Sequence, residues 1–128
     1  MKITSLYIYI DGSDLNDVAD KIESSIETWL NNTDFDAIIV NQKHERTPDL
    51  KNADLTDWDL GINLNYDQLS KLNEIANYLY SLAIKYNRNF ALGYYDATSN
   101  ITENISYFGS EDGKPKISEI YEILGYSC

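Results

Sequence analysis

The chain of 128 residues is long enough for one domain with a hydrophobic core, so we treat residues 1–128 as a single domain. Hydrophobic residues make up 43% and charged residues 24%, which is ordinary for a globular protein, but 21 Asp and Glu against 10 Lys and Arg give a net charge of −11. This charge argues against direct binding to nucleic acid or to an anionic membrane surface, and it favours a basic partner.

Cysteine and histidine are too scarce to build the common metal and nucleophilic sites. The chain has one cysteine, Cys128, and one histidine, His44. Neither an internal disulfide nor a closed zinc site with four nitrogen and sulfur ligands can therefore form within it. We find no signal-type segment and no apolar run long enough to cross a membrane. We expect a cytoplasmic protein that uses no metal and no other cofactor.

The first predicted element is a strand over Lys2–Ile10. Its leucine and isoleucine side chains fall on one face, and Tyr7 and Tyr9 fall on the other. Asp11–Asp14 then supplies turn and helix-capping residues. The helix that follows runs to Asn31, because apolar residues recur at steps of three and four. Its apolar stripe comprises Leu15, Val18, Ile22, Ile26 and Trp29.

The middle of the chain predicts two strands separated by a long charged segment. Phe35–Val40 is a short strand, and Asn41–Thr56 is a loop in which His44 is a solvated residue. Asp57–Leu64 has the clearest alternation in the chain and predicts a half-buried strand. Trp58, Leu60, Ile62 and Leu64 lie on one side of it, and Asp57, Asp59, Gly61 and Asn63 lie on the other.

The remaining elements are a helix, a hairpin and a short final helix. Tyr66–Tyr86 has an apolar stripe at helical spacing. Phe90–Tyr95 and Ile101–Phe108 are strands joined by five polar or small residues, which predicts a hairpin. Pro115 suits the first position of the last helix, and Gly125 suits its C-terminal cap.

The elements follow the order β-α-β-β-α-β-β-α, which indicates an α+β protein. Most strands alternate between apolar and polar residues, so one face of the sheet is covered and the other is partly open. We expect a two-layer α/β sandwich with about five strands in a mixed or antiparallel sheet and helices mainly on one face. The first six elements have a ferredoxin-like order, although order alone does not fix the strand pairing.

Catalytic signatures are absent from the sequence, so we expect no catalytic residue and no enzyme activity. There is no G-x-S-x-G motif, no dinucleotide-binding motif and no P-loop. Asp57 and Asp59 could act as an acid/base pair, but two carboxylates at this spacing are common on solvent-facing strands. The acidic runs Asp11–Asp17 and Asp54–Asp59 lack the spacing of a calcium-binding EF-hand loop.

Acidic residues and tyrosines are the remaining distinctive features. The first helix is the most acidic element, and its acids include Asp14 and Asp17. Eleven tyrosines occur in the chain, and tyrosine is enriched at protein interfaces. Our candidates for partner binding are Tyr7, Tyr9, Asp14, Asp17, Asp57 and Asp59. The alternative is that the last helix covers Tyr7 and Tyr9 and makes them part of the core.

The C-terminal stretch resembles the close of small bacterial immunity proteins, the antidotes of polymorphic toxin and contact-dependent growth inhibition systems. A strand ends in an aromatic residue and glycine, an acidic glycine turn follows, and proline opens a short helix. The residues concerned are Glu103-Asn104-Ile105-Ser106-Tyr107-Phe108-Gly109-Ser110-Glu111-Asp112-Gly113-Lys114-Pro115, then Glu119-Ile120 and Ile123-Leu124-Gly125. The likeness covers about 25 residues, and each piece is also ordinary turn and cap chemistry.

This resemblance implies a protein that binds and neutralises one cognate toxin domain in the cytoplasm, with a basic nuclease as the favoured class. Such a protein needs no cofactor, and it binds neither nucleic acid nor a membrane directly. Two alternatives stay open. One is a small-molecule-binding or enzymatic α/β domain that uses the open sheet face, with Asn41–Thr56 as a lid. The other is a nucleic-acid mimic that captures a DNA-binding protein.

Overall fold

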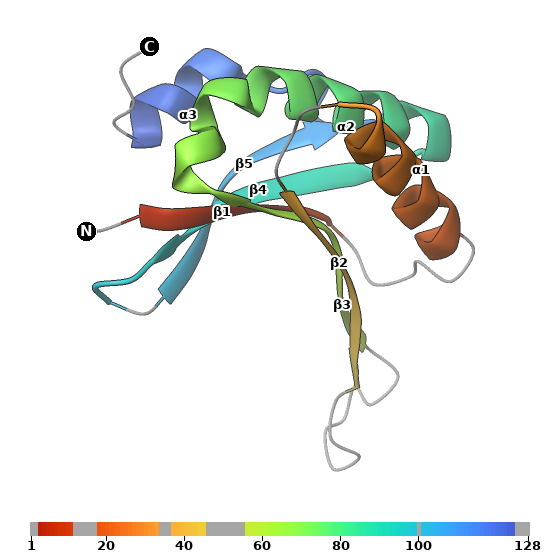
Figure 1. The fold of residues 1–128 in the computed structure, drawn as a ribbon, viewed down its shortest axis with the longest axis horizontal. Helices are drawn as coiled ribbons and strands as arrows, with labels where there is room; N and C mark the ends of the chain where they lie inside the picture. Colours follow the sequence, from red (N-terminus) through yellow and green to blue (C-terminus); the bar gives the residue numbers. More distant parts are fainter. Residues whose placement is uncertain (1–2, 12–17, 34–36, 46–55, 100, 125–128) are drawn as a thin grey trace.

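A computed structural model describes residues 3–11, 18–33, 37–45, 56–99 and 101–124. It has an α+β fold in which three α-helices pack on a five-stranded antiparallel sheet (Figure 1). The elements are β1 (Ile3–Ile10), α1 (Ala19–Asn31), β2 (Ala37–Glu45), β3 (Thr56–Asn65), a 3₁₀ helix η1 (Tyr66–Lys71), α2 (Leu72–Tyr86), β4 (Asn89–Asp96), β5 (Ile101–Gly109) and α3 (Ile117–Leu124). The predicted class, element order and number of strands are confirmed.

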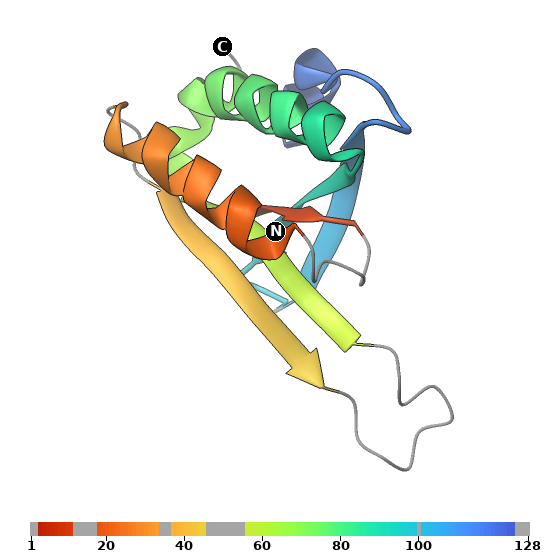
Figure 2. The same ribbon diagram turned by 90° about the vertical axis from the view of Figure 1, so that its right-hand side faces the viewer.

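The sheet has the strand order β2-β3-β1-β4-β5, and every neighbouring pair is antiparallel. The central strand β1 therefore lies between β3 and β4, so the first six elements form a split β-α-β arrangement to which β5 is added. All three helices lie on one side of this sheet (Figure 2). None of the helices in the described part of the chain has the length and apolar character needed to span a bilayer.

The core lies between the helices and the sheet, and alternation along the strands supplies one half of it. Leu6, Ile8 and Ile10 of β1 are buried beside the alternate apolar residues of β3 and β4. Phe90 and Phe108, paired across β4 and β5, stack with ring centroids 5.6 Å apart. Because successive strand residues point to opposite faces, the residues between these positions lie on the side without helices.

Aromatic side chains join the helices to one another. Trp29 of α1 stacks on Tyr78 of α2 with ring centroids 4.9 Å apart, and the Tyr78 hydroxyl donates to the Ser25 carbonyl oxygen at 2.8 Å. The Tyr121 hydroxyl of α3 donates to the carbonyl oxygen of Leu69 in η1, also at 2.8 Å. Each phenol buries its ring in the helix layer while its polar tip finds an acceptor.

Three element boundaries differ from those expected. Asn41–Thr56 is not a loop throughout, because β2 continues to Glu45 and places His44 opposite Asp57 in the β2–β3 pairing. Backbone pairing along this hairpin outweighs the low apolar content of its residues. The helix expected from Tyr66 begins as the 3₁₀ helix and becomes α-helical at Leu72, and the last helix begins two residues after Pro115. Gly125 lies outside the described residues.

Two isoleucines at neighbouring positions of the sheet provide a matched test of this packing. Ile62 is fully buried on the covered face, whereas Ile38 is 66% exposed on the other face. We expect Ile62→Ala to lower the free energy of unfolding by about 2–5 kcal/mol, because it leaves a cavity in the core. Ile38→Ala should change it by less than about 0.5 kcal/mol. Urea denaturation measures the free energy of unfolding of both variants. An equal decrease for the two would contradict the assignment of the two faces.

Candidate functional site

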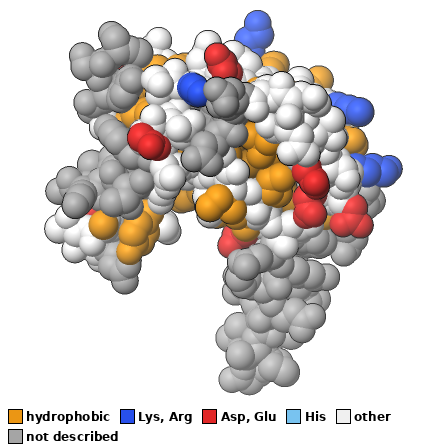
Figure 3. Space-filling view, viewed as in Figure 1, with side chains coloured by type: hydrophobic (Ala, Val, Ile, Leu, Met, Phe, Trp, Pro, Cys, Tyr) orange, Lys and Arg blue, Asp and Glu red, His pale blue; other side chains and the backbone are white. Residues whose placement is uncertain are grey.

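The sheet face without helices is the candidate site, and we call it the helix-free face. Strand register places on it Ser5, Tyr7 and Tyr9 of β1, Ile38 and Val40 of β2, Asp59 and Asn63 of β3, Gly93 of β4, and Asn104 and Tyr107 of β5. The space-filling view shows the molecule hollowed below β1 on this side, with hydrophobic and acidic side chains at the border (Figure 3).

Tyr7 crosses the neighbouring strand over a glycine. A β-carbon added to Gly93 of β4 would lie 2.2 Å from the Tyr7 hydroxyl oxygen, so only glycine leaves room for the phenol ring. The Tyr7 hydroxyl thereby reaches β5 and donates to Oδ1 of Asn104. Nδ2 of Asn104 in turn donates to the Tyr107 hydroxyl at 3.3 Å. Tyr7 thus links the central strand to the edge strand β5.

Tyr9 makes the corresponding contact on the other side of β1. Its ring stacks against Tyr7 with centroids 5.0 Å apart, and its hydroxyl donates to Oδ1 of Asn63 on β3 at 2.5 Å. Both tyrosines are half-buried. The tyrosine–asparagine network therefore runs across the face from β3 to β5, with its rings held in place before any partner arrives. Its members are Tyr7, Tyr9, Asn63, Asn104 and Tyr107.

The electrostatics of this network keep its two central phenols neutral. Partial burial, followed by the nearby Asp59 carboxylate, raises the pKa of Tyr9. Partial burial also raises the pKa of Tyr7, with added contributions from Tyr107, Tyr9 and Glu103 and a smaller one from Asp59. Both causes disfavour the negatively charged phenolate. At neutral pH the network therefore presents hydroxyl groups beside a carboxylate.

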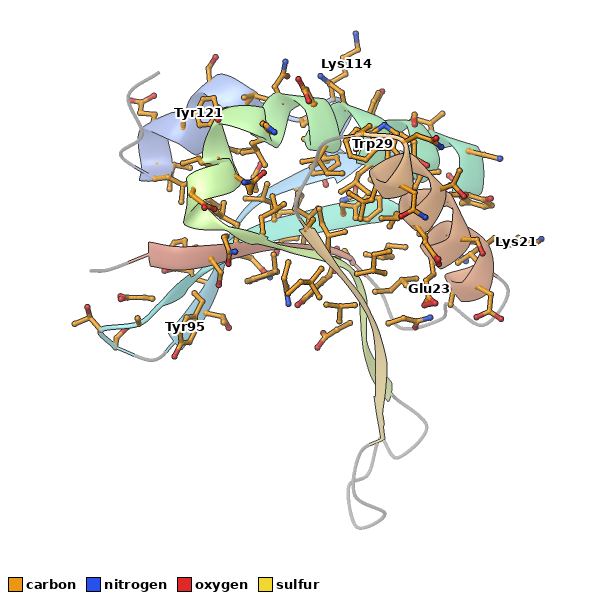
Figure 4. All side chains as sticks on the ribbon, in the orientation of Figure 1. Lys21, Glu23, Trp29, Tyr95, Lys114 and Tyr121 are labelled. Atoms are coloured by element: carbon orange, nitrogen blue, oxygen red, sulfur yellow. The ribbon has the colours of Figure 1, made fainter. Side chains whose placement is uncertain are left out.

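A hollow of about 500 Å³ lies next to the network at the β2 edge of the sheet. Its described lining consists of Tyr9, Glu23, Ile38, Ile39, Val40, Asn41, Asp59 and Asn63. Glu23 comes from α1 and accepts a hydrogen bond from Nδ2 of Asn41 at 2.9 Å. Figure 4 shows Glu23 extending from α1 toward the β2–β3 side, whereas Lys21 points away from it. We call this feature the β2 hollow.

The structure brings together three of the six residues predicted to bind a partner. Tyr7, Tyr9 and Asp59 share the helix-free face, and α3 packs into the core on the opposite side instead of covering the tyrosines. The backbone of Asp57 lies on β3, but its side chain is outside the described set, and so are Asp14 and Asp17.

Four residues that complete the network or make room for it were not among the predicted binding residues, although alternation had placed one of them, Asn63, on the polar side of its strand. Alternation with the apolar Phe108 could have placed Tyr107 on the open side. Asn104 could not be placed, because a register irregularity between Leu92 and Gly93 of β4 shifts its pairing with β5. Gly93 and Asn63 acquire their roles only through contacts with tyrosines from another strand.

Comparisons with known proteins add no assignment to these observations. No protein-family model, no curated protein sequence and no solved structure matches this chain. Among the residues whose placement is described, no three His, Cys, Asp or Glu side chains gather in a group that could hold a metal ion. The site is therefore interpreted from its own geometry and charge.

The charge of Asp59 gives a direct test of this geometry. Asp59→Asn removes a negative charge that disfavours the phenolate, so the pKa of Tyr9 should fall and the pKa of Tyr7 should fall less. Tyr78 is the internal control, because its pKa is raised by burial and by Tyr86 and not by Asp59. A pH titration of ring-labelled tyrosines by ¹³C NMR measures all three. An unchanged pKa of Tyr9 in the Asp59→Asn variant would show that Asp59 does not act on this network.

Proposed function

We propose that this protein binds a basic protein partner on its helix-free face and acts as an immunity protein that neutralises a cognate toxin domain in the cytoplasm. The observation that carries the proposal is the tyrosine–asparagine network with Asp59 at its side, on a sheet face that no described helix covers. A basic nuclease is the class of toxin that fits this surface best. No cofactor is needed for inhibition of this kind.

Tyrosine supplies the contact area that such binding needs. A phenol buries a large apolar ring, keeps a polar tip, and loses little conformational entropy on binding. Here the rings of Tyr7 and Tyr9 are already stacked, and their hydroxyls are already hydrogen-bonded to asparagines. These side chains therefore lose less conformational entropy when a partner binds. The network therefore suits tight protein recognition.

The negative charge of the protein favours a basic partner. The net charge of −11 attracts a basic protein over a distance and speeds their encounter at low salt. A nuclease presents lysine and arginine to the phosphates of its substrate, and carboxylates such as Asp59 can occupy the same positions. A second copy of this chain would carry the same −11 and would be repelled.

An open sheet with exposed aromatic residues also suits the stacking of nucleic-acid bases, so the two partners must be distinguished. Base stacking is normally combined with lysine and arginine that neutralise phosphates. Among the described residues of the helix-free face there is no lysine or arginine, and Asp59 is acidic. These features favour a basic protein over a nucleic acid.

The experiment that tests the proposal begins with capture of the partner. Tagged protein is used to isolate bound proteins from its native cells at low and moderate salt, and these are identified by mass spectrometry. The captured domain is then expressed with and without this chain. The proposal requires a basic domain that stops growth alone and permits growth when this chain is present. A bound metabolite without a protein partner would support the small-molecule-binding alternative instead.

Variants connect the rescue of growth to the helix-free face. Asp59→Lys reverses a charge on this face, whereas Glu119→Lys makes the same change at an exposed position of α3. We expect Asp59→Lys to slow association with the captured domain by about tenfold at low salt and to weaken the rescue. Glu119→Lys should retain the rescue. Equal association rates for the two variants, both folded by circular dichroism, would contradict the assignment of the face.

A further inference from the structure

The β2 hollow combines chemical groups that recognise one kind of side chain. Asp59 of β3 and the side-chain amide of Asn63 line it on the helix-free face. Asn41, which pairs opposite the buried Leu60, and its hydrogen-bond partner Glu23 of α1 line it from the helix-covered side of β2. The phenol ring of Tyr9 lines the same space. Among the described residues of the lining, none carries a positive charge. The hollow therefore favours a cation that also offers several hydrogen-bond donors.

Apolar surface accompanies these polar groups. Ile38, Ile39 and Val40 of the edge strand β2 contribute to the lining, and Ile38 is 66% exposed. Long cationic side chains place their methylene groups along apolar surface while their charged ends reach polar groups. A volume of about 500 Å³ accommodates such a side chain together with water. A free inorganic cation would leave the aliphatic part of this lining unused.

The arrangement distinguishes arginine from lysine. A guanidinium group is planar, carries five N–H donors in a fixed fork, and stacks on aromatic rings. It can therefore contact carboxylate and amide oxygens while its face lies on Tyr9. The lysine ammonium is a compact and strongly hydrated point charge that makes less use of a planar partner. The aromatic ring and the separated oxygen groups thus favour arginine.

We infer that the β2 hollow receives an arginine side chain of the basic partner. This inference rests on the proposed function and specifies one contact within it. The carboxylate of Asp59 pairs with the guanidinium, Tyr9 stacks on its face, and Ile38 and Val40 contact its methylene groups. The helix-free face then offers two adjoining features, a tyrosine–asparagine network for contact area and a hollow that selects arginine.

A small probe tests the hollow without the partner. Full-length ¹⁵N-labelled protein is titrated at low ionic strength with N-acetyl-arginine amide, N-acetyl-lysine amide and N-acetyl-citrulline amide, and amide shifts are followed by NMR. We expect saturable shifts at Tyr9, Val40 and Asp59 with the arginine probe. The lysine probe should bind at least about fivefold more weakly, and the uncharged citrulline probe should give no saturable shift.

Matched variants show whether the carboxylate on the helix-free face acts. Asp59→Asn should weaken binding of the arginine probe by about fivefold, the scale of one partly exposed ion pair. Glu23→Gln removes a charge on the helix-covered side of β2, where Glu23 accepts a hydrogen bond from Asn41, and should weaken binding by less than about twofold. Glu119→Gln removes a charge from α3, outside the hollow, and should leave the affinity within about twofold. Equal affinity of the wild-type protein for the arginine and lysine probes, or an unchanged affinity of Asp59→Asn for the arginine probe, would overturn the inference.

The outcome of this titration is separable from that of partner capture. If a basic toxin domain is captured but the arginine probe does not bind the hollow, the proposed function stands and the inference fails. If the probe binds as expected and no basic protein is captured, the hollow binds arginine but the immunity role fails.

Discussion

Strand β1 lies in the middle of the sheet, and the alternation of its side chains constrains both of its neighbours. Leu6 and Ile8 must face the helices, because they are the apolar half of the strand and are fully enclosed in the core. Antiparallel pairing with β3 and β4 then assigns the residues opposite them to the same face. A register slip of one residue would expose this apolar row and bury the tyrosines, so the burial of one face fixes the composition of the other.

The helix-free face is therefore a consequence of the core and is also organised in its own right. Tyr7 can cross β4 only because Gly93 has no side chain, and it finds its acceptor on β5. Tyr9 finds its acceptor on β3. These bonds order phenol rings that would otherwise be mobile on an exposed sheet. We propose that this ordering, with the carboxylate of Asp59 beside it, is what a basic partner recognises.

Much of the fold could be predicted from local patterns, whereas the site could be predicted only in part. Alternation in Asp57–Leu64 and in the first strand gave correct elements, and it placed Tyr7, Tyr9 and Asp59 on the open side. The extension of β2 to Glu45 depends on pairing with a distant strand and has no apolar pattern to reveal it. Asn104 joins the network through a register irregularity, which arises from the pairing of β4 and β5 and leaves no mark in the order of residues.

The most direct test of the helix-free face as the binding surface is hydroxyl-radical footprinting of tyrosines in the complex with the captured partner. The chain contains its own controls, because Tyr7, Tyr9 and Tyr107 lie on the helix-free face, whereas Tyr80, Tyr86 and Tyr121 belong to the helix layer. We expect the first group to lose reactivity on binding and the second to keep it. Loss of reactivity confined to the helix-layer tyrosines would place the partner on the opposite side of the molecule and contradict the proposal.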